Sequence, residues 1–72
     1  MAIMSEIEVQ VNGEPRHVAE NLSVHDFLGS LDLNPALIVV ERNGTILRRA
    51  DYKDTKVEPG DTLELVHFVG GG

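Results

Sequence analysis

The sequence predicts a small α+β domain in which a mixed sheet of about five strands packs against one main helix. Three observations lead to this prediction. Short runs alternate polar and apolar residues, which is the period of a half-buried strand. The pair Asn-Gly, a strong signal for a hairpin turn, occurs twice between such runs, at 12–13 and 43–44. A single apolar stripe with helical period lies between the two hairpins. The predicted order is strand, strand, helix, strand, strand, strand.

The first hairpin is predicted over residues 6–19. Alternation over 6–11 turns Ile7, Val9 and Val11 toward the interior. Asn12-Gly13 then reverses the chain, since both residues tolerate a positive φ. The return strand begins near Pro15, where the missing N–H of proline does little harm.

The helix is predicted to begin after Ser23, a good N-cap residue, and Asp26 three positions later resembles a capping box. Gly29 lies inside the helix and costs up to about 1 kcal/mol there. Asn34-Pro35 predicts the end of the helix, because a residue before proline is pushed out of the α region. The apolar stripe consists of Val24, Phe27, Leu28 and Leu31.

A third strand is predicted over 37–42, and its continuous apolar run indicates a central position in the sheet. A short strand over 45–47 follows the Asn-Gly turn, and 48–55 is polar and irregular. Three acids in the loops around this region are interpreted as solvated and not as a paired catalytic set. They are Asp51, Asp54 and Asp61.

The last strand is predicted over 62–69, after a turn at Pro59-Gly60. Leu63 and Leu65 share the face that enters the core, which leaves alternate residues on the opposite face beside the C-terminus. Apolar residues exposed together there would form a docking patch for a partner. The alternative is that Phe68 simply packs over the sheet edge. The predicted patch consists of Val66, Phe68 and Val69.

Composition excludes several classes of function. The net charge of −6 disfavours binding to nucleic acid. The absence of cysteine removes disulfides, thiolate zinc sites and cysteine nucleophiles, and the three histidines lack metal-ligand spacing. No signal peptide is visible, and the longest apolar run, 36–40, is far shorter than the roughly 20 residues of a membrane span. We therefore expect a soluble, cytoplasmic, monomeric protein without a metal or bound cofactor.

Three consecutive glycines, 70–72, end the chain. A frayed terminus is the alternative interpretation, but glycine lacks a Cβ, so such a tail can thread a narrow channel into another protein. Its reactive group is the carboxylate of Gly72, an anion at neutral pH that nucleophiles do not attack until it is activated. We expect a domain over 1–69, a flexible tail over 70–72, and a carrier or substrate in place of an enzyme.

Residues 61–72 resemble the C-terminus of the ThiS family, the sulfur carriers of thiamine biosynthesis, and are similar to the last strand of ubiquitin. Residues 11–16 look like the first hairpin of the family, 24–31 like its helix, and 39–44 like its central strand and turn. The resemblance covers all but the first four residues. It implies a ubiquitin-like β-grasp fold, in which the first and last strands pair in the middle of the sheet.

The resemblance also implies a mechanism. A ThiF-like adenylyltransferase would use ATP to adenylate Gly72, and sulfur from a cysteine desulfurase or another donor would displace AMP to leave a thiocarboxylate. A ThiG-like thiazole synthase would then take that sulfur for the thiazole ring. Gly72 would be the covalent site, and Gly70 and Gly71 would thread the active site of the partner.

Three other functions stay open at this point. The same chemistry could serve molybdopterin synthesis, as in the carrier MoaD. The chain could be a protein modifier, with Gly72 joined to a lysine amine. It could also be a β-grasp interaction module that acts without covalent chemistry.

Overall fold

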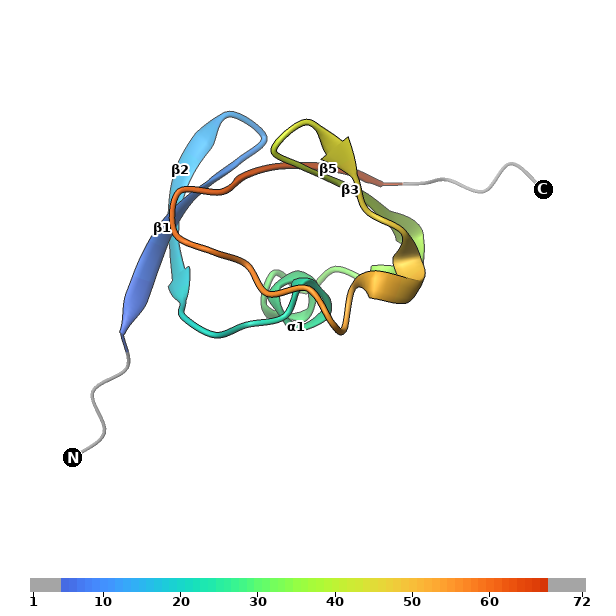
Figure 1. Ribbon diagram of the computed structural model, residues 1–72, viewed down its shortest axis with the longest axis horizontal. Coiled ribbons are helices and arrows are strands. Elements are labelled where there is room, and N and C mark those ends of the chain that lie inside the picture. Colours follow the sequence, from blue (N-terminus) through green and yellow to red (C-terminus); the bar gives the residue numbers. More distant parts are fainter. Residues whose placement is uncertain (1–4, 68–72) are drawn as a thin grey trace.

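The computed structural model describes residues 5–67 and shows one twisted sheet with a helix packed beneath it (Figure 1). The strands follow the order β2-β1-β5-β3-β4 across the sheet. Two short 3-10 helices, η1 (Pro35–Leu37) and η2 (Arg49–Asp51), lie in the connections. The main elements are β1 (Glu6–Val11), β2 (Glu14–Ala19), α1 (Val24–Ser30), β3 (Ile38–Arg42), β4 (Thr45–Ile46) and β5 (Thr62–His67).

The last strand of the chain occupies the middle of the sheet. β5 pairs in parallel with β1 through Gln10 opposite Thr62 and Val11 opposite Leu63. On its other side β5 pairs antiparallel with β3, from Arg42 opposite Leu63 to Ile38 opposite His67. This central pairing of first and last strands defines the β-grasp, so the predicted fold class and element order are confirmed.

Both Asn-Gly turns have the predicted conformation. Asn12 and Gly13 have φ values of 52° and 83°, and Asn43 and Gly44 have 52° and 85°, as in type I′ hairpin turns. The two asparagine side chains also hold β5: Leu65 N donates to Asn12 Oδ1 at 2.7 Å, and Thr62 N donates to Asn43 Oδ1 at 2.9 Å. The central strand is thus held on both sides by the side chains of two turns. The sequence predicted these turns from the backbone preference of Asn-Gly, and not from any contact with β5.

The core lies between the sheet and α1. The predicted helix stripe points into it: Val24, Phe27 and Leu28 are fully buried, and Leu31 packs against them half-buried. Tyr52, from a segment predicted to be polar and irregular, is buried as well. Its hydroxyl donates to the Ile38 carbonyl at 2.8 Å and accepts from Val40 N at 3.2 Å, which joins this segment to β3.

Helix α1 begins as predicted but ends earlier. Ser23 Oγ accepts from Asp26 N at 3.0 Å and caps the first turn. The helix stops at Ser30, because Asp32 takes a left-handed conformation (φ 61°) and Leu33 N donates back to the Leu28 carbonyl at 3.0 Å. This is a Schellman motif, which aspartate permits because it tolerates positive φ better than most residues. The prediction that the helix continues to 34–35 was wrong.

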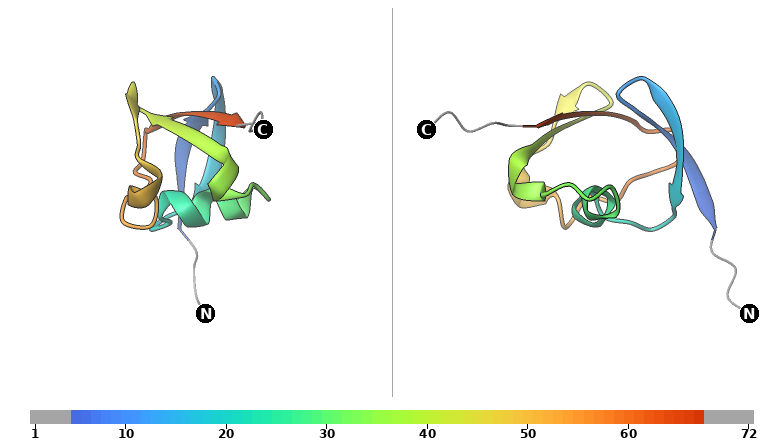
Figure 2. Two further views of the ribbon diagram at one scale, coloured as in Figure 1. Left: turned by 90° about the vertical axis from the view of Figure 1, so that its right-hand side faces the viewer. Right: turned by 180° about the vertical axis from the view of Figure 1, so that it is seen from behind.

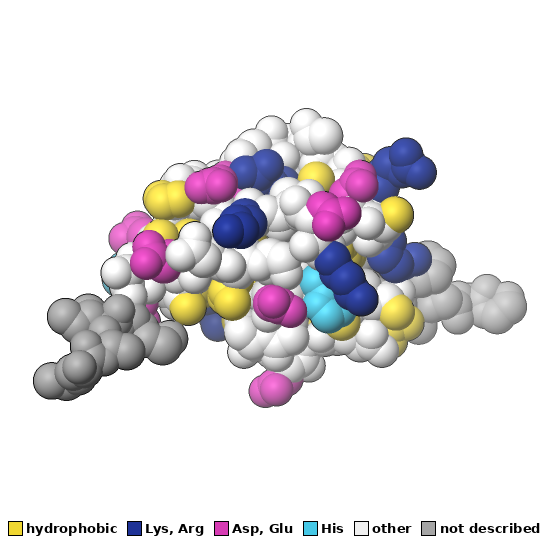
Figure 3. Space-filling model, turned by 60° about the horizontal axis from the view of Figure 1, so that its bottom comes forward, with side chains coloured by type: hydrophobic (Ala, Val, Ile, Leu, Met, Phe, Trp, Pro, Cys, Tyr) yellow, Lys and Arg dark blue, Asp and Glu magenta, His cyan; other side chains and the backbone are white. Residues whose placement is uncertain are grey.

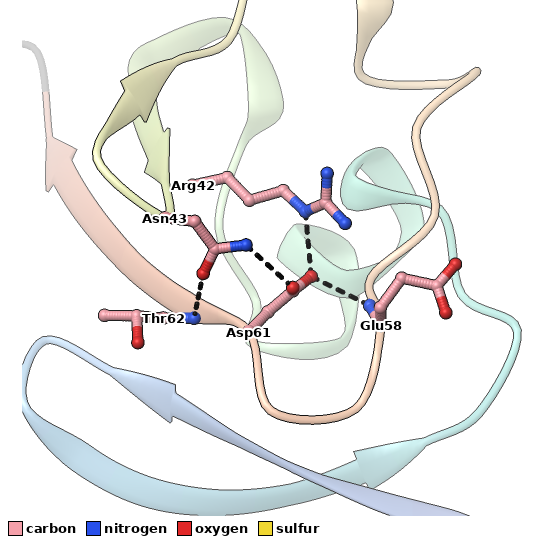
Figure 4. Close-up of polar contacts among 5 residues, drawn as sticks. All are labelled: Arg42, Asn43, Glu58, Asp61 and Thr62. Atoms are coloured by element: carbon pink, nitrogen blue, oxygen red, sulfur yellow. Dashed lines mark hydrogen bonds and ion pairs between the residues drawn. The ribbon is translucent and has the colours of Figure 1, made fainter.

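Asp61 corrects a second prediction, since it is not a solvated loop acid. It is 4% exposed, and its carboxylate accepts from Arg42 Nε at 2.8 Å, from Asn43 Nδ2 at 3.0 Å and from Glu58 N at 2.8 Å (Figure 4). Three donors, from the β3–β4 hairpin and from the loop before β5, converge on one carboxylate and fix the start of β5 against that hairpin. Asp51 and Asp54 are exposed, as predicted.

These contacts set the charge state of Asp61. Burial raises the pKa of Asp61, but hydrogen bonds from Glu58 N and from the Arg42 and Asn43 side chains outweigh it and leave the pKa below its ordinary value. A carboxyl whose pKa is lower in the folded chain stabilises the fold above the unfolded pKa of about 3.9. That contribution is lost as the pH falls through the folded pKa.

We predict that Asp61→Asn lowers the free energy of unfolding by about 1–3 kcal/mol at pH 7, because the half-buried Arg42 loses its charged partner and buried donors lose their acceptor. Urea unfolding at pH 7 and pH 3 measures this. The difference between variant and wild type should shrink at the lower pH. Asp54→Asn, which changes an exposed loop acid, should have little effect at either pH. Equal losses from both substitutions would contradict a special role for Asp61.

A second prediction concerns two glycines whose missing Cβ atoms would each meet nothing within 4 Å. Gly29→Ala should stabilise the fold by about 0.5–1 kcal/mol, because alanine has the higher helix propensity. Gly13→Ala should destabilise it by roughly 1–2 kcal/mol, because φ is 83° there. Denaturant unfolding checks both variants, and effects of the same sign would show that backbone conformation does not decide them.

Candidate functional site

The candidate site is the end of β5, where the chain runs from the sheet toward its glycine terminus. Side chains of β5 alternate as predicted: Leu63 is fully buried, Leu65 is half-buried against the core, and Val66 is 61% exposed on the opposite face. Figure 2 shows β5 crossing above α1 and ending at the side of the molecule away from the start of β1. An anchored strand thus carries an exposed apolar residue next to the terminus.

Most of the predicted site lies outside the described residues 5–67. This holds for the glycine tail (Gly70, Gly71 and Gly72) and for two of the three predicted patch residues, Phe68 and Val69. Of the predicted docking patch, the structure therefore describes Val66, whose side chain is exposed as expected. Docking of a partner on the patch stays a prediction.

The strand register adds apolar neighbours to Val66. Directly opposite residues of antiparallel strands share a face of the sheet. Val39 lies opposite Val66, and Ile46 lies opposite Glu41, which itself lies opposite Glu64. Ile46 is 64% exposed. We name these five residues of β3, β4 and β5 the outer face. Sequence reasoning missed Val39 and Ile46, because facing residues can be paired only once the register is known.

The outer face is also acidic. Glu41 and Glu64 stand opposite each other across β3 and β5, a like-charge pair that works against folding. The face thus combines an apolar group with two carboxylates. The side on which α1 lies differs, since charges of both signs are interspersed there with small, separate hydrophobic spots (Figure 3). The outer face therefore suits a partner surface with an apolar centre and basic surroundings.

Other kinds of site find no support in residues 5–67. No group of three or more histidine and acidic side chains within that range could hold a metal ion. The helices of the same range are also too short and too polar to cross a membrane.

This geometry defines the class of the protein as a small β-grasp domain whose central strand leads into a C-terminal glycine tail. Comparison with known proteins gives the particular family. The model of the ThiS family matches residues 9–72, which takes in the core and the tail. The chain belongs to the ThiS family, the sulfur carriers of thiamine biosynthesis, so it is a carrier protein and the resemblance seen in the sequence is confirmed.

Individual relatives agree with the family. A crystal structure of the thiamine biosynthesis protein ThiS from Geobacter metallireducens superposes with a TM-score of 0.79 at 38% identity, covering 92% of this chain and 100% of that one. The sulfur carrier protein ThiS of Bacillus subtilis is 34% identical over 65 residues, 89% of this chain and 98% of that protein. At 38% identity, the likeness to the Geobacter structure supports the family as well as the fold.

A third relative is much longer. The thiazole synthase of Paramagnetospirillum magneticum is 36% identical over 66 residues, which are 92% of this chain but 20% of that protein. The chain thus spans about a fifth of the thiazole synthase that it matches. In that relative a domain similar to this one is part of the same polypeptide as the rest of a thiazole synthase.

Proposed function

We propose that the C-terminal carboxylate of Gly72 is the group that carries sulfur. The observation that supports this most is that the family match runs through residue 72. A terminal carboxylate is an anion at neutral pH and must be activated before sulfur can replace its oxygen. Three glycines without Cβ atoms let that carboxylate enter a narrow active site.

The reaction proceeds in three steps. A carboxylate oxygen of Gly72 attacks the α-phosphorus of ATP on a ThiF-like adenylyltransferase, pyrophosphate leaves, and an acyl adenylate forms. The terminal sulfur of a persulfide, formed by a cysteine desulfurase or another donor, then attacks the acyl carbon, and AMP leaves with the bonding electron pair. A thiol reductant supplies two electrons to cleave the S–S bond of the resulting acyl disulfide, which leaves a thiocarboxylate on Gly72 and the donor as a free thiol. ATP belongs to the partner enzyme, and this chain supplies only the acyl group.

The thiocarboxylate donates its sulfur for the thiazole ring on a ThiG-like thiazole synthase. Relatives in which a similar domain is joined to a thiazole synthase support this pairing. In this proposal the predicted patch Val66, Phe68 and Val69 docks on the partner while Gly70 and Gly71 occupy its channel. The exposed Val66 at the end of β5 supports that role.

We predict that incubation with the adenylyltransferase, ATP, cysteine, a desulfurase and a thiol reductant raises the intact mass by the exchange of one oxygen for one sulfur. Deletion of Gly72 should abolish the change, because the acyl group then sits one residue short of the active site. Mass spectrometry of the whole protein is the measurement. Conjugates with other proteins through lysine would instead indicate a modifier, and an unchanged mass with an active partner would contradict the proposal.

A second prediction tests the docking role of the outer face. Val66→Ser should weaken binding to the adenylyltransferase about tenfold, because an exposed apolar contact near the tail is lost. Its effect on stability should be small, since Val66 is 61% exposed. Thr62→Ala changes the same strand and face at the far end from the tail, and it should bind like the wild type. Isothermal titration calorimetry measures the affinity of both variants for the adenylyltransferase. Equal affinities would show that Val66 does not contact the enzyme.

A further inference from the structure

A groove of about 510 Å³ lies beside the end of β5, between the β1–β2 hairpin and the turn that follows α1. Its lining includes buried and half-buried apolar side chains from three parts of the chain, with exposed polar residues alongside. The apolar lining residues include Val11, Leu33, Ile38 and Leu65, and the exposed polar ones include Arg16 and His67. The groove therefore offers apolar surface next to a strand, but at a different place from the outer face.

The backbone of β5 is open on the side of this groove. The main-chain N–H and C=O groups of residues 61, 63, 65 and 67 point toward the β1 side of β5. Gln10 N donates to the Asp61 carbonyl at 2.9 Å, and Asn12 N donates to the Leu63 carbonyl at 2.8 Å. Leu65 N continues the series, but its acceptor is the Asn12 side chain. At this point β1 ends in the Asn12-Gly13 turn, so its pairing with β5 stops.

The next polar groups on that side are the Leu65 carbonyl and the His67 N–H. Within residues 5–67 nothing pairs with them, because the β1 pairing ends at Val11 opposite Leu63. On its other side β5 stays paired with β3 as far as Ile38 opposite His67. The end of β5 is thus a held strand with one free edge and a groove beside it.

Two other strand edges in the described part of the chain are protected in part. The Tyr52 hydroxyl satisfies the Ile38 carbonyl and the Val40 N–H on the outer side of β3. β2 begins with Glu14 and Pro15, and proline offers no N–H to an incoming strand. The edge at Leu65 and His67 has no such protection. An exposed edge with a pocket beside it is the geometry by which an extended peptide joins a sheet, where main-chain bonds give affinity and the pocket takes a side chain.

We propose that an extended segment of thiazole synthase pairs with the free edge of β5 and places an apolar side chain in the groove. This rests on the proposed function for the identity of the partner. The partner is favoured because a similar domain forms about a fifth of one thiazole synthase chain, an arrangement that holds the two surfaces at high effective concentration. Because Asp32 and Arg16, of opposite charge, both line the groove, the main chain and an apolar side chain would dominate recognition.

Strand addition at this edge would also align the tail. His67 immediately precedes Phe68 and the rest of the terminus. A strand bound alongside β5 would run next to the residues that enter the active site and set their direction. The edge would act as a guide for the tail, apart from the covalent chemistry at Gly72.

Amide hydrogen exchange measured by NMR tests the proposal directly, with full-length chain alone and with thiazole synthase added. In the free chain the His67 amide should exchange fast. In the complex it should slow at least tenfold, because it gains a main-chain acceptor. An unchanged exchange rate at His67 in a saturated complex would overturn the proposal.

Two matched pairs of variants give an independent readout. His67→Pro removes the free N–H, whereas His67→Ala keeps it. Proline should disturb no existing sheet bond, since the opposite residue Ile38 directs its own groups to Tyr52 and Pro35. Ser30→Trp fills the groove, whereas Gly29→Trp places the same ring one exposed position away.

Binding to thiazole synthase, measured by calorimetry, should weaken at least tenfold for the first member of each pair and less than threefold for the second. Circular dichroism confirms that each variant is folded, and if His67→Pro fails to fold, the tryptophan pair decides. Equal binding within both pairs would contradict the proposal.

The two proposals can fail separately. If Gly72 takes up sulfur and the tail amides are protected in the complex while His67 is not, strand addition is wrong and the proposed function stands. If His67 becomes protected on thiazole synthase but Gly72 never takes up sulfur, the edge is a binding site and the carrier chemistry is wrong.

Discussion

The position of β5 between β1 and β3 is the constraint on which the rest of the structure depends. The strand that comes last in the sequence must occupy the middle of the sheet, with a parallel neighbour on one side and an antiparallel neighbour on the other. Its parallel contact covers only two residue pairs, so side chains complete the attachment. Asn12 and Asn43 bond its amides from two turns, and the buried Asp61 fixes its start.

This arrangement explains how an unreactive domain can serve a chemical reaction. The core and its polar contacts hold one strand in place, and in the proposed function that strand presents the glycine tail to another protein. Specificity can then come from surfaces beside the tail: the outer face around Val66, and the groove on the free edge of β5. In the proposed function the chain needs no pocket of its own for chemistry, because the activating groups belong to its partners.

The sequence predicted those features whose signals are local. Alternation predicted the strands, Asn-Gly the two turns, and Ser23 the helix start, because each depends on neighbouring residues. Asp61 was mistaken for a solvated acid because its donors Arg42 and Asn43 come from a distant hairpin. The same reason hides Tyr52 and the pairing of Val39 with Val66. Within the site, the functional role of the glycine tail stays a prediction from composition and position, and the groove could be found only from the sheet register.

Asparagine side chains from two turns hold β5 in the middle of the sheet. Native-state hydrogen exchange of the Thr62 and Leu65 amides tests this attachment most directly. Both amides donate to asparagine side chains. Thr62 is exposed and Leu65 is half-buried, so surface position alone would predict fast exchange. We expect both amides to exchange slowly, close to the limit set by global unfolding. Exchange at the rate of the exposed loop around Asp54 would contradict it.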